Sequence, residues 1–307
     1  YKMNRYEKQN GKQGYKDMGN GQIIKDAHAK INLGLDVLRK REDGYHEVKM
    51  IMQTIGLHDT LTFSRTEDEG IVIESDSGRL PLDEHNLIYK AAKIFFEEVG
   101  QAFGVHVFLE KRIPIAAGMA GGSTDAAAAF EALNELAGCP FSQEKLMKIA
   151  VRVGADVPYC ILKGTALSEG IGEILTALPP VAPANLVIAK PDIDVSTAFV
   201  YKNLRVNELD SHPDIDGMRA AIEKNDLQGV TKRLGNVLET VTIPAHPIIG
   251  KIKACCMTNG AVNALMSGSG PTVFAIFDSP VKAGRAAEKI RSEFQLHEVY
   301  VTEFWGQ

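Results

Sequence analysis

The glycine- and alanine-rich stretch PIAAGMAGGST at residues 114–124 most constrains how this chain can fold. Three glycines and three alanines among its eleven residues leave the backbone largely uncovered, so its N–H groups can approach a polyanion closely. The following DAAAAFEAL is rich in strong helix formers, which places Ser123 and Thr124 near a helix N-terminus. Such a position favours phosphate. We therefore predict a phosphate-binding loop leading into a helix, with a plain tight turn as the alternative.

Two familiar phosphate-binding motifs do not account for this loop. No G-x-x-x-x-G-K-[ST] run occurs anywhere in the chain, so the loop is not a Walker P-loop. The spacing of Gly118, Gly121 and Gly122 does not match G-x-G-x-x-G, and no βαβ crossover with an acidic residue at the required distance follows the loop. We therefore expect a third kind of phosphate-binding loop, distinct from both of these motifs.

Composition and charge exclude several classes of protein. At 307 residues the chain is long enough for two domains, and its net charge of −5 argues against a general nucleic-acid binder. No apolar run reaches the ~20 residues of a membrane-spanning helix, and the four cysteines show no zinc or disulfide spacing. We therefore expect a cytoplasmic protein with a small-molecule partner and no nucleic-acid or membrane partner. Residues 1–22 are expected to form a flexible tail, with a partner-binding tail as the alternative.

Hydrophobic periodicity predicts a mixed α/β first half. In AKINLGLDV (29–37) apolar residues alternate with polar or small ones, so Lys30 and Asn32 point to the same side of a strand. Further strands are expected at 46–56, 60–65, 70–75 and 104–110, and helices at 84–100 and 143–153.

The prolines of LPPVAPAN (178–185) mark the expected domain boundary. Beyond it the sequence predicts strands at 186–190, 261–266, 272–277 and 297–304, two or three helices over 198–258, and a helix at 280–294. This order is that of a ferredoxin-like α+β layer. The expected division is a tail (1–22), an N-terminal domain (23–180) and a C-terminal domain (181–307).

Three separated motifs resemble those of one enzyme family. The segment AKINLGLDVLRKREDGYHEV (29–48), the loop PIAAGMAGGSTDAAA (114–128) and the turn SGSGPTVFAIF (267–277) are similar, in order and spacing, to the GHMP small-molecule kinases. DGYHEV and GADVPY (154–159) resemble the branch that phosphorylates a cytidine-diphosphate-linked methylerythritol. His28 in place of a usual proline, and Ala120 in a loop that is usually closer to GLGGGSS, are departures that remove no catalytic group.

The resemblance implies a fold and an activity. The fold is a two-domain α+β architecture, with an N-terminal mixed α/β, ribosomal-protein-S5-like domain and a C-terminal ferredoxin-like domain. The activity is that of an ATP-dependent kinase that uses ATP and Mg²⁺, with nucleotide and catalytic groups in the N-terminal domain and substrate-binding groups in the C-terminal one. The alternatives are a GHMP kinase for homoserine or a mevalonate phosphate, and a non-catalytic nucleotide or sugar sensor. The sequence leaves open whether the chain forms a homodimer.

The resemblance places the catalytic pair at Lys30 and Asp156. Lys30 would offset charge on the migrating phosphoryl group, and Asp156 would take the proton of the substrate hydroxyl. From the residues alone, the simpler interpretations are a solvated strand lysine and a helix-cap or turn aspartate between Gly154 and Pro158.

The same resemblance implies the ligand contacts. The residues expected to bind ATP are Pro114, Ile115, Ala116, Ala117, Gly118, Met119, Ala120, Gly121, Gly122, Ser123 and Thr124, with Asn86 and Lys111 bordering the adenine and phosphate pockets. Those expected to bind substrate are Asn32, Tyr45, His46, Thr197 and Tyr201, although a Tyr-His pair after Asp-Gly also fits a plain hairpin turn. The turn at 267–271 is expected to close the site. No dedicated carboxylate cluster for a metal is visible, so Mg²⁺ is expected to arrive with ATP and to contact Ser123 or Thr124.

Overall fold

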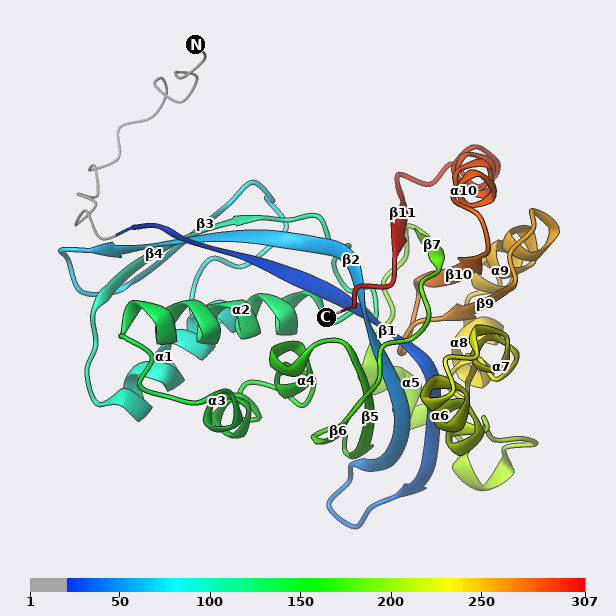
Figure 1. The fold of residues 1–307 in the computed structure, drawn as a ribbon, viewed down its shortest axis with the longest axis horizontal. Coiled ribbons are helices and arrows are strands. Elements are labelled where there is room, and N and C mark those ends of the chain that lie inside the picture. The colour runs from blue at the N-terminus through cyan, green and yellow to red at the C-terminus, as the bar shows by residue number, and fades with distance from the viewer. Residues whose placement is uncertain (1–20, 307) are drawn as a thin grey trace.

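The computed structural model describes residues 21–306. Six strands from the first half of the chain and the short β8 from the second half build a mixed sheet of seven strands. The strands are β1 (Ile23–Lys40), β2 (His46–Thr66), β3 (Ile71–Ser75), β4 (Gly104–Glu110), β5 (Thr165–Gly170), β6 (Ile174–Leu178) and β8 (Gly235–Asn236). They follow the order β3-β4-β2-β1-β8, while β5 pairs with β2 and β6. In Figure 1, β1 and β2 are the long curved ribbons that run from one side of the molecule towards the other. Most of the predicted tail, residues 1–20, lies outside the described residues.

The sequence predicts two strands at 46–56 and 60–65, but the structure has the single strand β2. It pairs with β1 from His46 to Phe63, with three register shifts along the way. Gly56 and the polar residues after it suggest a break, yet β1 lies opposite them and supplies backbone partners on both sides of that point. A continuous partner strand therefore overrides the local pattern.

Four helices cover one face of this sheet (Figure 1). They are α1 (Leu87–Val99), α2 (Gly121–Leu136), α3 (Gln143–Ala150) and α4 (Val157–Leu162). The side chain of Ser142 caps α3, which confirms its predicted start. The buried alanines 126–129 have little bulk, so α2 can pack closely against β1. The sequence analysis did not predict α4, β5 or β6, which are all short.

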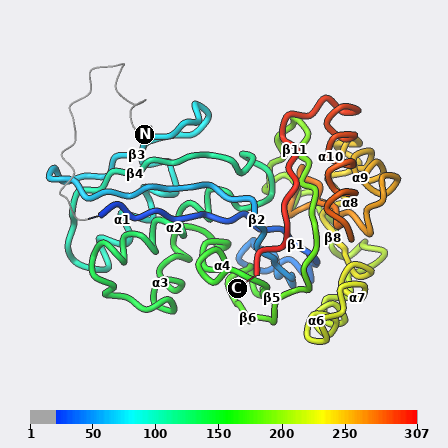
Figure 2. Tube along the Cα trace, turned by 45° about the horizontal axis from the view of Figure 1, so that its top comes forward, coloured from blue at the N-terminus to red at the C-terminus, as the bar shows by residue number. Residues whose placement is uncertain are grey.

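The second half of the chain forms a four-stranded antiparallel sheet in the order β11-β7-β10-β9. Its strands are β7 (Asn185–Lys190), β9 (Asn263–Met266), β10 (Val273–Phe277) and β11 (Glu298–Glu303). Helices α9 (Ile248–Thr258) and α10 (Pro280–Phe294) pack on it, and Figure 2 shows β11 running beside β7. The ferredoxin-like order of elements is therefore confirmed.

Five helices lie between residues 197 and 258, where the sequence predicts two or three. They are α5 (Thr197–Asn203), α6 (Ile215–Glu223), α7 (Leu227–Lys232), α8 (Glu239–Ala245) and α9, with a 3₁₀ turn at Val206–Glu208. The side chains of Asp214 and Asp226 accept backbone N–H groups and start α6 and α7 as separate helices. These caps give more and shorter helices than the sequence predicts.

An apolar core joins the two halves. Ile31 and Leu33 of β1 share a buried cluster with Ile188, Phe274 and Ile276 of the second sheet. The middle of β1 is therefore buried on both faces. Because β8 also pairs with β1, the division at residue 180 stays a prediction.

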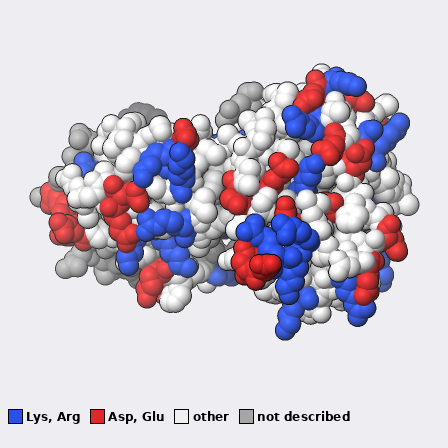
Figure 3. Space-filling model, turned by 90° about the horizontal axis from the view of Figure 1, so that it is seen from below, with Lys and Arg blue, Asp and Glu red and all other residues white. Residues whose placement is uncertain are grey.

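Acidic and basic side chains are mixed on the surface seen from below (Figure 3). The surface has two lobes in this view and narrows between them. Within residues 21–306, no helix is both long enough and apolar enough to cross a membrane.

Candidate active site

A cavity of about 940 Å³ lies where the two halves of the chain meet. The glycine-rich loop and the turn at 267–271 both contribute to its wall and touch each other. The hydroxyl of Ser267 donates to the carbonyl oxygen of Gly118 over 2.9 Å. Gly118 has a φ of 70°, and a Cβ there would lie 2.3 Å from the Ser267 carbonyl oxygen, so this close approach requires glycine. The turn therefore closes the cavity from the second half, as the resemblance implies.

Lys30 lies buried in the middle of β1, with 5% of its surface exposed. Its ammonium donates to Asn32 Oδ1 over 2.9 Å and lies 3.9 Å from Asp156 Oδ2. Its backbone N–H donates to the carbonyl oxygen of Met119, which ties the strand to the loop. A solvated strand lysine is thus not what the structure contains, and Lys30 and Asn32 do point to the same side.

Asp156 immediately precedes α4 and lies on the cavity wall. It holds the N-cap position, yet its side chain accepts no capping hydrogen bond from the helix. The side chain is 37% exposed. Its carboxylate is therefore available to a hydroxyl group in the cavity.

The glycine-rich loop curls tightly before α2. Ala116, Gly118 and Ala120 all have positive φ, at 53°, 70° and 59°. Successive N–H groups in such a backbone form a concave site for anions. Nine of the eleven predicted loop residues line the cavity: Pro114, Ile115, Ala116, Ala117, Gly118, Ala120, Gly121, Gly122 and Ser123. The predicted loop and helix are present, since α2 begins at Gly121.

Met119 and Thr124, the other two loop residues, point away from the cavity. Met119 packs in the apolar cluster between the halves. Thr124 is 2% exposed, and its hydroxyl donates to the carbonyl oxygen of His28 over 2.7 Å. Of the two predicted hydroxyl groups, Ser123 alone is therefore placed to meet phosphate or a metal.

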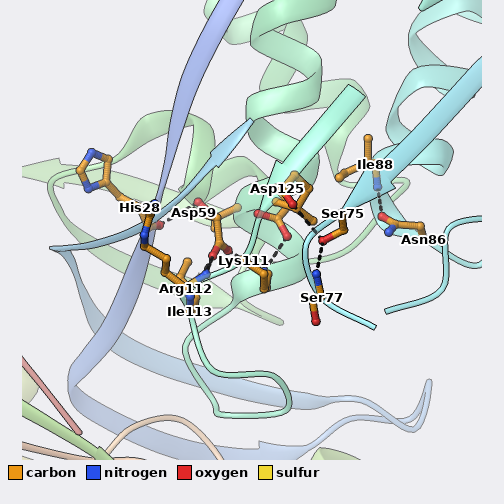
Figure 4. Close-up of polar contacts among 12 residues, drawn as sticks. His28, Asp59, Ser75, Ser77, Asn86, Ile88, Lys111, Arg112, Ile113 and Asp125 are labelled. Atoms are coloured by element: carbon orange, nitrogen blue, oxygen red, sulfur yellow. Dashed lines mark hydrogen bonds and ion pairs between the residues drawn. The ribbon is translucent and has the colours of Figure 1, made fainter. Parts of the chain in front are cut away.

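Asn86 and Lys111, expected at the nucleotide borders, have protein partners (Figure 4). The Asn86 side chain accepts from Ile88 N and donates to the carbonyl oxygen of Pro81, which makes it the cap of α1 and keeps it off the cavity wall. Lys111 does line the cavity, but its ammonium is held between Asp59 and Asp125. Asn86 therefore caps α1, and its place at the adenine border stays a prediction.

An aromatic group forms another part of the wall. The rings of His46 and Tyr201 have centroids 5.2 Å apart, and Tyr45 is 61% exposed beside them in the sequence. Burial, with a smaller effect of Lys40, lowers the pKa of His46. Its ring is therefore neutral at pH 7 and offers one hydrogen-bond donor and one acceptor. The wall also includes Thr197, so the structure brings all five predicted substrate residues to one cavity.

Basic side chains dominate the charge of the cavity wall. They are Lys30, Lys40, Lys111 and Lys202. Among the described residues that line the cavity, Asp156 is the one carboxylate. Lys30 and Lys111 are paired with carboxylates, so Lys40 and Lys202 add positive charge beyond these pairs, which favours a polyphosphate. The sequence analysis did not single out Lys40 or Lys202, although Lys202 directly follows Tyr201.

Comparison with known proteins identifies the family. The family model described as GHMP kinases N terminal domain matches residues 86–164, and the one described as GHMP kinases C terminal matches residues 218–296. A 4-diphosphocytidyl-2-C-methyl-D-erythritol kinase from Lachnoclostridium phytofermentans is 52% identical over 279 residues, covering 91% of this chain and 96% of the relative. The chain belongs to the GHMP kinases.

Further GHMP kinases match over most of their length. A protein of the same name from Lachnospira eligens is 48% identical over 277 residues, covering 90% of this chain and 96% of the relative. A crystal structure of 4-(cytidine 5'-diphospho)-2C-methyl-D-erythritol kinase superposes with a TM-score of 0.79 at 32% identity, covering 92% of this chain and all of that one. Homoserine kinase from Cytophaga hutchinsonii shares the fold, with a TM-score of 0.73 at 20% identity over 95% of this chain and 96% of its own.

The two departures from the GHMP kinase pattern differ in position. The ring of His28 lies 4.6 Å from that of Trp305 and is off the cavity wall, so this departure does not reach the site. Ala120 is on the wall in the left-handed conformation at the start of α2. A residue with a Cβ pays about 1 kcal/mol in that conformation, where glycine would not.

Proposed function

We propose that this chain transfers the γ-phosphoryl group of ATP to the 2-hydroxyl of 4-diphosphocytidyl-2-C-methyl-D-erythritol, in the non-mevalonate route to isoprenoid precursors. The Lys30–Asp156 pair, on the cavity that the glycine-rich loop and the His46–Tyr201 rings share, carries this proposal. The 52% and 48% identical relatives bear the name of this kinase. We propose the cytoplasm as its location, since ATP is available there, and small molecules rather than nucleic acid as its ligands.

We assign the nucleotide to the loop side of the cavity. The backbone N–H groups of the loop and of the first turn of α2 suit the phosphates. Leu80 and Leu87 line the same cavity, and Leu87 packs near Gly122 at the start of α2. These apolar side chains suit the faces of an adenine ring.

We assign the phosphate acceptor to the aromatic side of the cavity. A cytosine ring can stack on Tyr45 or Tyr201, and the neutral ring of His46 can hydrogen-bond its edge. Thr197, whose hydroxyl shares a 2.8 Å hydrogen bond with Ser269, is proposed to face the same nucleoside. The reacting hydroxyl would then lie towards Lys30 and Asn32.

The chemistry follows from these placements. As the substrate hydroxyl oxygen forms its bond to the γ-phosphorus, the bond from that phosphorus to the ADP oxygen breaks, and the hydroxyl proton passes to Asp156. The Lys30 ammonium stabilises the charge on the migrating phosphoryl group, and its hydrogen bond to Asn32 holds it in place. Positioning and charge stabilisation supply most of the catalysis in such a transfer.

The cavity fits Mg²⁺ bound to ATP better than a metal held by the protein alone. Within the described part of the chain, Asp83, Glu84 and His85 form the group of three candidate metal ligands, and they are exposed and off the cavity wall. Ser123 and Asp156 offer oxygen atoms on the wall. When bound, Mg²⁺ neutralises charge on the phosphates.

The proposal is tested by measuring ADP release from Mg-ATP with four acceptors in parallel. These are 4-diphosphocytidyl-2-C-methyl-D-erythritol, homoserine, mevalonate and galactose. We expect turnover with the first alone. Turnover with another acceptor would contradict the cytidine assignment, and ATP binding without turnover on any of the four would favour the sensor alternative.

His46→Ala should raise the KM for the cytidine substrate about 10-fold, because a half-buried ring that can hydrogen-bond cytosine is lost. The KM for ATP should not change. His58→Ala, which removes a ring off the cavity wall, is the matched control and should leave both constants unchanged. An unaltered KM for the cytidine substrate in His46→Ala would remove this residue from the proposed cytosine site.

The neighbours Ser123 and Thr124 should respond differently to loss of their hydroxyl groups. Thr124→Val should lower the free energy of unfolding by about 1 kcal/mol, because the His28 carbonyl oxygen loses a buried donor. Ser123→Ala should instead raise the KM for ATP about 10-fold, because a hydrogen bond to a charged phosphate is lost. Denaturant unfolding and steady-state kinetics of both variants separate the two effects. If Thr124→Val raised the KM for ATP and Ser123→Ala did not, the phosphate contact would be assigned to Thr124 instead of Ser123.

A further inference from the structure

Three charged side chains outside the catalytic pair are buried together beneath the glycine-rich loop. The exposed fractions of the Asp59, Lys111 and Asp125 side chains are 0%, 6% and 4%. Lys111 Nζ lies 2.5 Å from Asp59 Oδ2 and 2.7 Å from Asp125 Oδ2 (Figure 4). The three come from β2, from the segment after β4 and from α2. We call them the loop-base cluster.

The loop-base cluster holds the chain where it enters the glycine-rich loop. Asp59 Oδ1 accepts the backbone N–H groups of Arg112 and Ile113, over 2.6 and 2.8 Å. Lys111 directly precedes these residues, and its own ammonium is bonded to the other oxygen of Asp59. One carboxylate therefore fixes both the backbone and the side chain at the loop entrance.

The cluster also holds the chain where it leaves the loop. Asp125 lies in the first turns of α2, and its hydrogen bond to Lys111 joins that helix to the loop entrance. A Cβ built on Gly121, the first residue of α2, would lie 3.2 Å from Lys111 Nζ. The ammonium is thus packed against the helix N-terminus that faces the cavity. Asp59 and Lys111 together connect β2 to both ends of the loop.

We propose that Asp59, Lys111 and Asp125 are positioning residues that hold the two ends of the glycine-rich loop in the arrangement that binds the phosphates of ATP. This inference rests on the proposed function of the loop as a nucleotide site. It gives Lys111, which also lines the cavity, a task beyond the predicted one, since its ammonium hydrogen-bonds Asp59 and Asp125.

This role differs from simple stabilisation of the fold for two reasons. Replacing buried ion pairs by apolar side chains is often neutral or stabilising, so a buried cluster of this kind is weak evidence for stability alone. Asp125 Oδ1 is moreover buried without a hydrogen-bond partner, which is unfavourable for the folded state. The cluster is therefore better explained by the loop geometry that it imposes.

The charge of the cluster is compatible with phosphate nearby. Burial and the neighbouring Asp59 raise the pKa of Asp125 to about 8, although Lys111 opposes the shift. The shift reduces the negative charge of the cluster near the loop. Repulsion of a polyanion bound by the loop is reduced accordingly.

The experiment compares Mg-ATP binding by the full chain and by Asp59→Asn and Lys111→Met, using calorimetry without any phosphate acceptor. We expect both variants to bind Mg-ATP at least ~10-fold more weakly, because displaced loop N–H groups lose their alignment with the phosphates. Hydrogen exchange over 114–120 should accelerate in both variants.

Lys253→Met is the matched control. Lys253 forms two hydrogen bonds with Glu239 in the second half of the chain and is off the cavity wall. Lys253→Met should lower the unfolding midpoint without changing the affinity for Mg-ATP. Wild-type affinity in both Asp59→Asn and Lys111→Met would overturn the proposal, whatever their unfolding midpoints. If the wild-type chain bound no Mg-ATP, both this inference and the proposed function would be overturned. If the wild type binds Mg-ATP, the affinities of the variants test the loop-base cluster alone.

Discussion

Asp156→Asn should lower kcat by at least ~100-fold while the protein stays folded. The amide cannot take the proton that the substrate hydroxyl loses. The change is mild for the structure, because the Asp156 side chain is part-exposed and makes no capping hydrogen bond to α4. The KM for ATP should change little. Steady-state ADP release and a thermal unfolding scan of the variant measure both quantities.

Asp278→Asn provides the control for this substitution. Asp278 pairs with Lys282 on the surface and is off the cavity wall. Asp278→Asn removes one negative charge, as Asp156→Asn does, and should keep the wild-type kcat. Undiminished turnover in Asp156→Asn would remove this residue from the mechanism.

Lys30→Met should lower kcat by about 1,000-fold, the upper end of what one preorganised charge-stabilising group contributes. Methionine occupies a similar volume in the buried position on β1, so the fold should persist. Lys30→Arg should not restore activity, because a planar guanidinium cannot take the place of a compact ammonium between Asn32 and Asp156. Single-turnover kinetics at saturating ATP separate this loss from weaker binding.

Lys49→Met is the matched control for Lys30→Met. Lys49 is also a strand lysine paired with an aspartate, Asp216, but it is off the cavity wall. Its removal should leave kcat unchanged. A wild-type kcat in Lys30→Met, or the same loss in Lys49→Met, would contradict the role given to Lys30.

Residue types and short spacings predict the elements that carry the site. The alanine run after the loop indicates a helix, and α2 begins at Gly121. Helix α10 has the predicted bounds, 280–294, because Pro280 starts it and an amphipathic pattern continues from there. The two-residue period of a strand correctly puts Lys30 and Asn32 on one side. These features depend on neighbours in the chain.

Local patterns fail where the partner comes from far along the chain. The apparent break in β2 is bridged by β1. Lys111 lines the cavity, but the sequence does not indicate that Asp59, 52 residues earlier, holds its ammonium. The hydrophobic periodicity of the sequence does not indicate contacts between residues that lie so far apart in the chain.

The sequence alone was sufficient to identify the family and to predict the glycine-rich loop and the residues proposed for catalysis, because motifs record residue types in a given order. The burial of Lys30, its 3.9 Å separation from Asp156 and the contact of Gly118 with Ser267 arise when the two halves pack. The energy of a charge pair depends on distance and on exclusion of water. The order of residues alone determines neither the distance between these groups nor their exclusion from water. The chemistry proposed for them therefore depends on the folded arrangement.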